Sequence, residues 1–271
     1  MNIVTDAKFD ALAKRVRALQ NEVGELVLAR DVLLFDVGPS LESRYWLLIG
    51  VVESATLELE LDVLRRRRRL ELLQAADNRE EKPDVDAIEN LLDEELKTFV
   101  EQIEIADAKL KEASKFAAAP ELSANVAKRL RSLYLQLVKK LHPDVAGADV
   151  PDAAFKLKIA VEAYKRGDLA ALEALSAAVE AFADDGVLSP ETTAFDELLQ
   201  RESALQKSRD ELKSQIEKIK SEFPFNVADL LDDPEALEKR LDELRQKQLE
   251  FKALRDRYQQ RIEEILNRWE I

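Results

Sequence analysis

Residues 126–141 read VAKRLRSLYLQLVKKL, residues 142–144 read HPD, and residues 153–165 read AAFKLKIAVEAYK. Apolar residues recur at steps of three and four in both outer segments, which is the period of an amphipathic α-helix. Pro143 disfavours helical backbone at His142 and fixes its own φ, so the tripeptide predicts a stiff turn. Two helices joined by a short loop pack antiparallel, and we expect them to hold the tripeptide at their tip.

The apolar stripes of these two helices predict one shared core. We expect it to contain Leu130, Leu133 or Tyr134, Leu137 and Leu141 of the first helix, and Leu157, Val161 or Ala160, and Tyr164 of the second. Asp144 would then present its carboxylate at an exposed tip, where it suits bidentate pairing with an arginine. A third helix is predicted to follow, because Gly167 suits the left-handed position that ends one helix and Asp168 suits the cap that begins another.

The layout of helix, His-Pro-Asp tripeptide and helix resembles the J domain over roughly residues 121–178. J domains are the modules by which DnaJ-type co-chaperones switch on the ATPase of DnaK-type chaperones. Four residues stand where the J-domain pattern has its core Tyr, Leu, Phe and Tyr, namely Tyr134, Leu137, Leu157 and Tyr164. With this spacing the match is specific, and it covers well under a third of the chain.

The resemblance implies roles for two groups of residues. In J domains the aspartate of the tripeptide contacts an arginine of the ATPase domain, a role that falls to Asp144, with His142 and Pro143 positioning it. The preceding helix docks on an acidic patch of the chaperone through basic residues, a role that falls to Arg131, Lys139 and Lys140. None of these residues would carry out bond chemistry, because a J protein biases its partner by binding one conformation better.

The chain departs from the J-domain pattern at several points. Leu135 and Gln136 occupy two positions that are commonly basic, which thins the positive stripe in its middle. The short first helix with its Tyr-Tyr-x-x-Leu-Gly pattern is missing, and we expect a helix over residues 84–118 to brace the module instead. Neither a Gly/Phe-rich linker nor a substrate-binding β-domain follows, which is typical of J proteins that keep only the J domain and use other modules for targeting.

Residues 1–119 are predicted to form three long helices. The first covers residues 5–37 and is predicted to end at Gly38-Pro39, and the second runs from Ser40 to about Glu80. The third, over residues 84–118, is expected to be its antiparallel neighbour because the connection is short. The packed seam of the second helix is predicted at Leu41, Tyr45, Leu48, Val52, Ala55 and Leu59, shifting by one residue to Val63, Leu70 and Leu73.

Residues 65–69, inside the second helix, are five consecutive arginines. Consecutive residues of a helix point about 100° apart, so the five cannot share a face. We expect solvated arginines that pair with neighbouring Glu and Asp residues. A docking patch for an acidic partner is the alternative, and RNA binding is disfavoured because no aromatic residue interleaves the run.

Residues 189–271 are predicted to form an antiparallel coiled-coil hairpin. Apolar residues repeat every seven positions in both arms, at Leu198, Leu205, Leu212 and Ile219 and at Leu237, Leu244, Phe251, Tyr258 and Ile265. Ser189-Pro190 is expected to cap the first arm, and Asp233-Pro234 the second. Folding the arms together would place Leu205 beside Phe251.

Composition supports an all-α fold and excludes several classes of function. The 271 residues are 46% hydrophobic and 35% charged, with only 6 Gly and 8 Pro, which is typical of long helices. The absence of Cys and the single His exclude thiol catalysis, disulfides and Cys/His metal sites. A net charge of -14 disfavours binding to nucleic acid. The most apolar run, residues 45–52, is far too short to span a membrane, and no signal peptide is visible.

The sequence therefore predicts an elongated all-α protein in which coiled-coil regions, residues 1–119 and 189–271, flank a central J-like module, residues 120–183. We expect a cytoplasmic co-chaperone that is not an enzyme and uses no metal or cofactor. Its expected partners are a DnaK-type chaperone and an unidentified client protein recruited by the coiled coils, and exposed seam residues would also allow a homodimer. The alternative is a coiled-coil scaffold or adaptor whose J-like fold no longer activates a chaperone.

Overall fold

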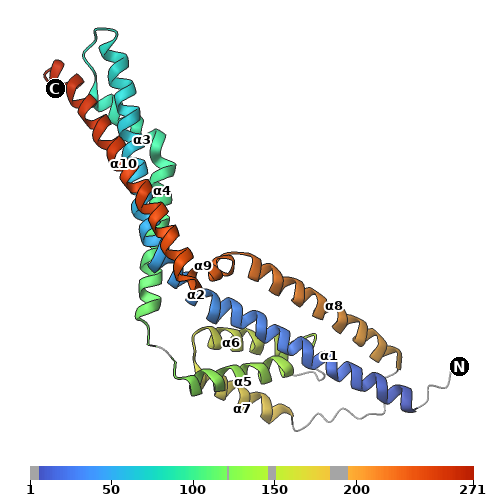
Figure 1. The fold of residues 1–271 in the computed structure, drawn as a ribbon. Helices are drawn as coiled ribbons and strands as arrows, with labels where there is room; N and C mark the ends of the chain where they lie inside the picture. Colours follow the sequence, from blue (N-terminus) through green and yellow to red (C-terminus); the bar gives the residue numbers. More distant parts are fainter. Residues whose placement is uncertain (1–5, 121, 146–150, 184–194) are drawn as a thin grey trace. The chain divides into compact units, whose positions relative to one another are not determined.

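The computed structural model describes residues 6–120, 122–145, 151–183 and 195–271, and these residues form an all-α protein (Figure 1). The predicted fold class is confirmed. The chain divides into two compact units, and we call Met1–Pro39 with Pro120–Asn226 unit 1 and Ser40–Ala119 with Val227–Ile271 unit 2. The predicted division into residues 1–119, 120–183 and 189–271 is therefore wrong, because each unit combines an early segment of the chain with a late one.

Unit 1 is built from five long helices and a π-turn. Their bounds are Asp6–Val32 (α1), Leu33–Val37 (η1), Ala124–Leu141 (α5), Ala153–Lys165 (α6), Leu169–Ala183 (α7) and Phe195–Ser221 (α8). Helices α5, α6 and α7 pack against one another in pairs, and α1 packs against both α5 and α8. Together they enclose one apolar core, to which α1, α5 and α8 all contribute buried residues.

Local capping signals set the ends of the helices in unit 1, and those at Gly167 and Asp168 are as predicted. The Ser123 hydroxyl accepts a hydrogen bond from the Val126 N–H at 3.4 Å and begins α5. Gly167 follows α6 with a left-handed φ of 66°. Residues that carry a Cβ rarely adopt this conformation, so glycine is favoured here. The Asp168 carboxylate then accepts a hydrogen bond from the Ala171 N–H at 2.9 Å and begins α7.

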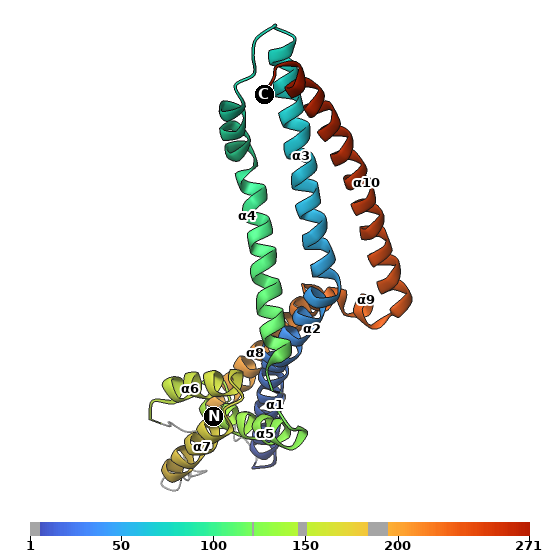
Figure 2. The same ribbon diagram turned by 90° about the vertical axis from the view of Figure 1, so that its left-hand side faces the viewer.

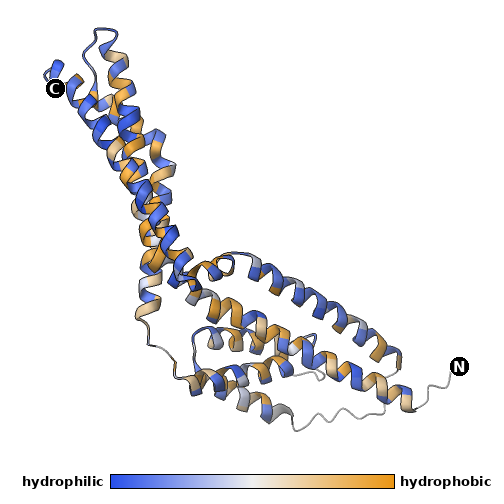
Figure 3. Ribbon diagram, in the orientation of Figure 1, coloured by the Kyte–Doolittle hydropathy of each residue, from blue (hydrophilic) through white to orange (hydrophobic). Residues whose placement is uncertain are grey.

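Helix α8 lies along α1 and not along the last helix of the chain. Arg15 Nε donates to Glu202 Oε1, and Lys213 Nζ donates to Glu22 Oε1, both at 2.7 Å. The residue numbers on the two helices rise together, so α1 and α8 run parallel. Figure 3 shows that α8 is largely hydrophilic, and only a narrow apolar stripe faces the core.

The predicted hairpin over residues 189–271 is therefore wrong. Leu205 and Leu212 are buried in the core of unit 1, whereas Leu244 is buried in unit 2. A seven-residue repeat shows that a helix has a packed face, but it does not identify the partner. The predicted cap at Ser189-Pro190 lies outside the described residues.

Unit 2 is built around three long helices and shorter turns. Their bounds are Trp46–Gly50 (η2), Val51–Asp77 (α3), Val85–Ala118 (α4), Ala228–Asp232 (α9) and Pro234–Arg268 (α10). Helix α3 packs against both α4 and α10 (Figure 2). As predicted, α4 runs antiparallel to α3. Helix α10 runs parallel to α3, because Arg240 pairs with Glu53 and Arg268 pairs with Asp77.

The helix that begins with α1 does not end at Gly38-Pro39 as predicted, because it continues through η1 into α2 (Gly38–Tyr45). In this wide turn the Gly38 N–H donates to the Leu33 carbonyl oxygen, five residues back. A Cβ at Gly38 would lie 2.7 Å from that oxygen, so the close approach requires glycine. Pro39 follows directly, and a proline inside a continuous helix removes one backbone hydrogen bond and favours a local distortion of this kind.

A second π-turn, η2, changes which residues of the predicted seam face the core of unit 2. Leu48 and Ala55, predicted to be packed, are exposed, whereas Ile49 and Thr56 are buried. The later part of the seam is confirmed, since Val63, Leu70 and Leu73 are all buried. Because a π-turn adds one residue to a helical turn, it rotates the helix surface relative to a regular heptad count.

No helix in the described part of the chain has both the length and the apolar character needed to cross a membrane.

Candidate functional site

The His142-Pro143-Asp144 tripeptide forms a turn at the end of α5. His142 has φ -71° and ψ 129°, the extended backbone that a following proline requires. The Val145 N–H donates to the His142 carbonyl oxygen at 3.0 Å, and the Asp144 N–H donates to His142 Nδ1 at 3.3 Å. Pro143 and Asp144 are exposed, while His142 is half-buried. The turn therefore presents the carboxylate of Asp144 outward, as the sequence predicts.

The core beneath the tripeptide contains the residues expected there. Buried side chains are Leu130, Tyr134, Leu137, Leu141 and Tyr164, and Leu157 is half-buried at the edge of the same cluster. The rings of Tyr134 and Tyr164 stack, with centroids 4.4 Å apart and planes 16° from parallel. This contact joins α5 to α6 and gives the turn a rigid base.

Helix α1 braces this module through a buried polar contact that the sequence did not indicate. Asp31 is 2% exposed and accepts a hydrogen bond from the Tyr134 hydroxyl at 2.6 Å. Arg30 neutralises the carboxylate from 2.7 Å away. Burial, followed by the negative charge of Asp31, raises the pKa of Tyr134 above its ordinary value of 10.0. Helix α4, which was expected to brace the module, belongs to unit 2, and within unit 1 the helix that packs on α5 in this way is α1.

The basic residues predicted to dock on a chaperone pair with acidic residues of the same unit. Arg131 pairs with Asp36 of η1, Lys139 Nζ lies 4.0 Å from Glu25, and Lys140 Nζ lies 3.3 Å from Glu180. The stem of Lys139 also lies across Gly24, where a Cβ would be 3.0 Å from its Cγ. Pairs this exposed contribute about 0–1 kcal/mol each, so a partner could exchange them.

The turn contacts α8 through Asp144 and α1 through Val145, the residue that follows the tripeptide. The Ser208 hydroxyl donates to Asp144 Oδ2 at 2.7 Å, and Gln20 Nε2 donates to the Val145 carbonyl oxygen at 2.9 Å. Sequence analysis missed Ser208 because it lies 64 positions from Asp144, and no local pattern links residues so far apart. The contact leaves Asp144 exposed but occupies one of its carboxylate oxygens.

Titration of His142 offers a test of this geometry. Burial lowers the pKa of His142 below 6.5; Asp144 and Asp31 oppose the shift, and Arg30 adds to it. Because His142 is the only histidine of the chain, its ring signals in NMR spectra need no assignment. We expect a titration midpoint below 6.5. A midpoint at or above 6.5 would contradict the half-buried position.

The same shift predicts how stability depends on pH. Between the two pKa values the unfolded chain binds more protons at His142 than the folded chain does. The contribution of His142 to folding is therefore complete above pH 6.5 and declines as the pH falls through the lower pKa of the folded state. His142→Gln should flatten this part of a plot of thermal stability against pH.

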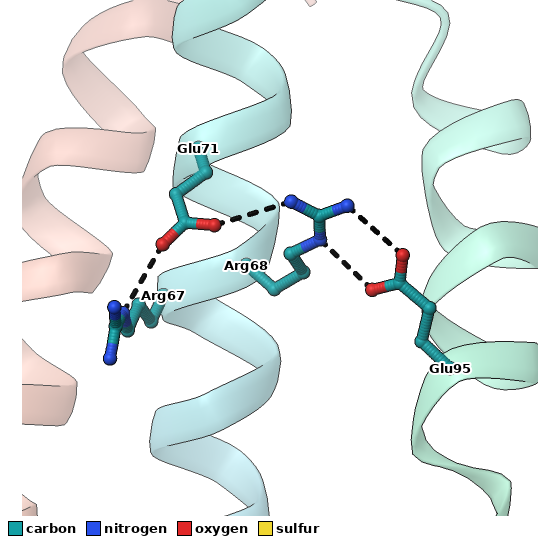
Figure 4. Close-up of polar contacts among 4 residues, drawn as sticks. All are labelled: Arg67, Arg68, Glu71 and Glu95. Atoms are coloured by element: carbon teal, nitrogen blue, oxygen red, sulfur yellow. Dashed lines mark hydrogen bonds and ion pairs between the residues drawn. The ribbon is translucent and has the colours of Figure 1, made fainter.

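The five arginines at residues 65–69 pair within unit 2, as the first interpretation predicted. Figure 4 shows Arg67 and Arg68 sharing Glu71, while Arg68 also reaches Glu95 of α4. The remaining three pair as Arg65 with Glu89 and Asp93, Arg66 with Asp62, and Arg69 with Glu89. The run thus lies mainly along the contact of α3 with α4, and the alternative of an acidic docking partner has no support.

The described residues contain no group of three His, Cys, Asp or Glu side chains arranged to hold a metal ion. Comparison of the chain with family models, with curated proteins and with solved structures finds no match.

Proposed function

We propose that this protein is a J-type co-chaperone that docks on a DnaK-type chaperone in the cytosol and stimulates its ATP hydrolysis. The observation that carries the proposal is the exposed carboxylate of Asp144, held at a proline turn at the end of α5, whose Tyr134 stacks on Tyr164 of α6 in the core. A carboxylate fixed in this way suits bidentate pairing with an arginine of the partner. The chain acts by binding and performs no bond chemistry.

Unit 2 is proposed to recruit a client protein or place the chaperone. Its three long helices leave several large apolar side chains exposed, among them Val51, Val100 and Ile105 at 48%, 39% and 61%. Exposed apolar residues on long helices suit packing against another helical protein, or against a second copy of the chain.

The test is the steady-state ATPase rate of a cognate DnaK-type chaperone with and without this protein. We expect wild type to stimulate the rate, and Asp144→Asn and His142→Gln to lose about tenfold or more of the stimulation. The first removes the charge of the contact, and the second removes the ring that accepts the Asp144 N–H and positions that residue. Asp152→Asn is the matched control, because Asp152 is also exposed and lies just before α6. It should stimulate as wild type does.

A scaffold or adaptor with a J-like fold is the second candidate. The observation in its favour is that Arg131, Lys139 and Lys140 pair with carboxylates of unit 1, which leaves less positive charge for a chaperone. Absence of stimulation by wild type with several cognate chaperones would support this candidate over the first.

A further inference from the structure

The contact between Ser208 and Asp144 joins α8 to the carboxylate that is proposed to pair with the chaperone. We propose that α8 is an intramolecular occupant of the tripeptide surface, and that a DnaK-type chaperone must displace it to pair with Asp144. The inference rests on the proposed function and adds a regulated step to it.

The position of α8 beside the tripeptide is fixed by buried residues on both sides of Ser208. Leu205 and Leu212, three residues before and four residues after Ser208, are 1% and 6% exposed in the core of unit 1. They hold one turn of α8 where the Ser208 hydroxyl reaches Asp144 Oδ2 at 2.7 Å. A bidentate arginine needs both carboxylate oxygens and open space in front of them, so it competes with α8.

The rest of the α8 interface is suited to release. The helix is largely hydrophilic (Figure 3), and the apolar residues of its stripe are separated by polar ones such as Glu202. Its ion pairs to α1 involve Arg15 and Lys213, whose side chains are 56% and 52% exposed, and exposed pairs are weak and screened by salt. Displacement still has to expose the buried residues of α8, which are Leu205, Leu212 and Ile216. Local opening of one helix costs less than unfolding the whole unit.

Most of the buried apolar residues of unit 1 lie on α1, α5, α6 and α7, and α8 contributes Leu205 and Leu212. Tyr134, Leu137 and Tyr164 are buried among residues of α5, α6 and α7 and of α1. Release of α8 would therefore free the tripeptide without unfolding its base.

Cross-linking tests the contact without any chaperone. The chain has no cysteine, so the pair Asp144→Cys with Ser208→Cys introduces the only two thiols. We expect a disulfide under mild oxidation, visible as a shift in non-reducing electrophoresis. The control pair is Asp144→Cys with Ser203→Cys, since Ser203 is an exposed serine of the same helix. Equal cross-linking by both pairs, or none by the first, would overturn the inference.

ATPase stimulation tests the consequence. Ser208→Asp places a second carboxylate against Asp144, and the repulsion should free α8. We expect Ser208→Ala to lower the concentration for half-maximal stimulation about three- to tenfold, the effect of losing one hydrogen bond of ordinary net strength. Ser208→Asp should lower it further, because it adds repulsion to the loss of the bond. Ser203→Asp, the matched control, should behave as wild type.

The two proposals fail in different ways. If wild type stimulates the chaperone and the Ser208 variants do no more, α8 is not a competitor and the proposed function stands. If neither wild type nor Ser208→Asp stimulates any cognate chaperone, the proposed function fails, and the competition proposed for α8 fails with it. Stimulation by Ser208→Asp where wild type gives little would support both.

Discussion

Replacing Tyr134 with alanine should destabilise unit 1 by about 3–5 kcal/mol, the usual cost of truncating a large buried aromatic side chain. Tyr134 is fully buried, stacks on Tyr164 with centroids 4.4 Å apart and donates its hydroxyl to Asp31. Truncation leaves a cavity between α5 and α6 and removes one partner of a buried carboxylate. Urea unfolding followed by circular dichroism would measure the loss.

The Tyr134→Phe variant separates the ring from the hydroxyl. It keeps the stacking on Tyr164 and removes only the hydrogen bond to Asp31, whose charge Arg30 still neutralises. We expect a loss of about 1–2 kcal/mol, the cost of one hydrogen bond to a charged acceptor. If Tyr134→Ala cost less than about 1 kcal/mol, the stacked tyrosines would not be the base of the tripeptide turn.

Features that depend on a few neighbouring residues could be predicted from the sequence. The caps at Ser123, Asp168 and Asp233 begin α5, α7 and α10, and Gly167 ends α6. In each case one side chain or one backbone conformation satisfies the end of a helix, so no distant contact is needed. For the same reason, the backbone of the tripeptide turn followed from Pro143 alone.

The pairing of the long helices could not be predicted in the same way. The heptad repeats of α8 and α10 fit each other antiparallel, yet α8 pairs with α1 and α10 with α3, both in parallel. Contacting residues are separated by similar distances along the sequence in the two helix pairs. The separation is 187 residues for Arg15 of α1 with Glu202 of α8, and 187 for Glu53 of α3 with Arg240 of α10. A search for parallel pairing at a constant separation could therefore have found both, and the repeats alone could not distinguish the two arrangements.

The residues of the candidate site also fall into those that local sequence identifies and those that only the helix pairing reveals. His142, Asp144 and the core tyrosines lie within one short stretch of sequence and were found there. Asp31 and Ser208 contact that stretch from α1 and α8, so finding them required the helix pairing to be known.

The two leucines Leu73 and Leu48 should respond very differently to truncation, although the heptad count places both on one seam. Leu73→Ala should destabilise unit 2 by about 2–5 kcal/mol, because a fully buried leucine leaves a cavity when it is shortened. Leu73 is 0% exposed and packs with Ile262 and Ile265 of α10. Leu48→Ala should cost less than about 1 kcal/mol, because Leu48 is 39% exposed within the π-turn η2.

The comparison tests the rotation of the helix surface that η2 produces. Both changes are Leu→Ala within one continuous helical stretch, so helix propensity is equally affected, and urea unfolding of both variants gives the difference directly. Ile49→Ala tests the opposite case, because Ile49 is 0% exposed. This substitution should cost about 2–5 kcal/mol. If Leu48→Ala proved as costly as Leu73→Ala while Ile49→Ala were mild, the regular heptad register would hold through residues 46–50 and the π-turn would not exist in solution.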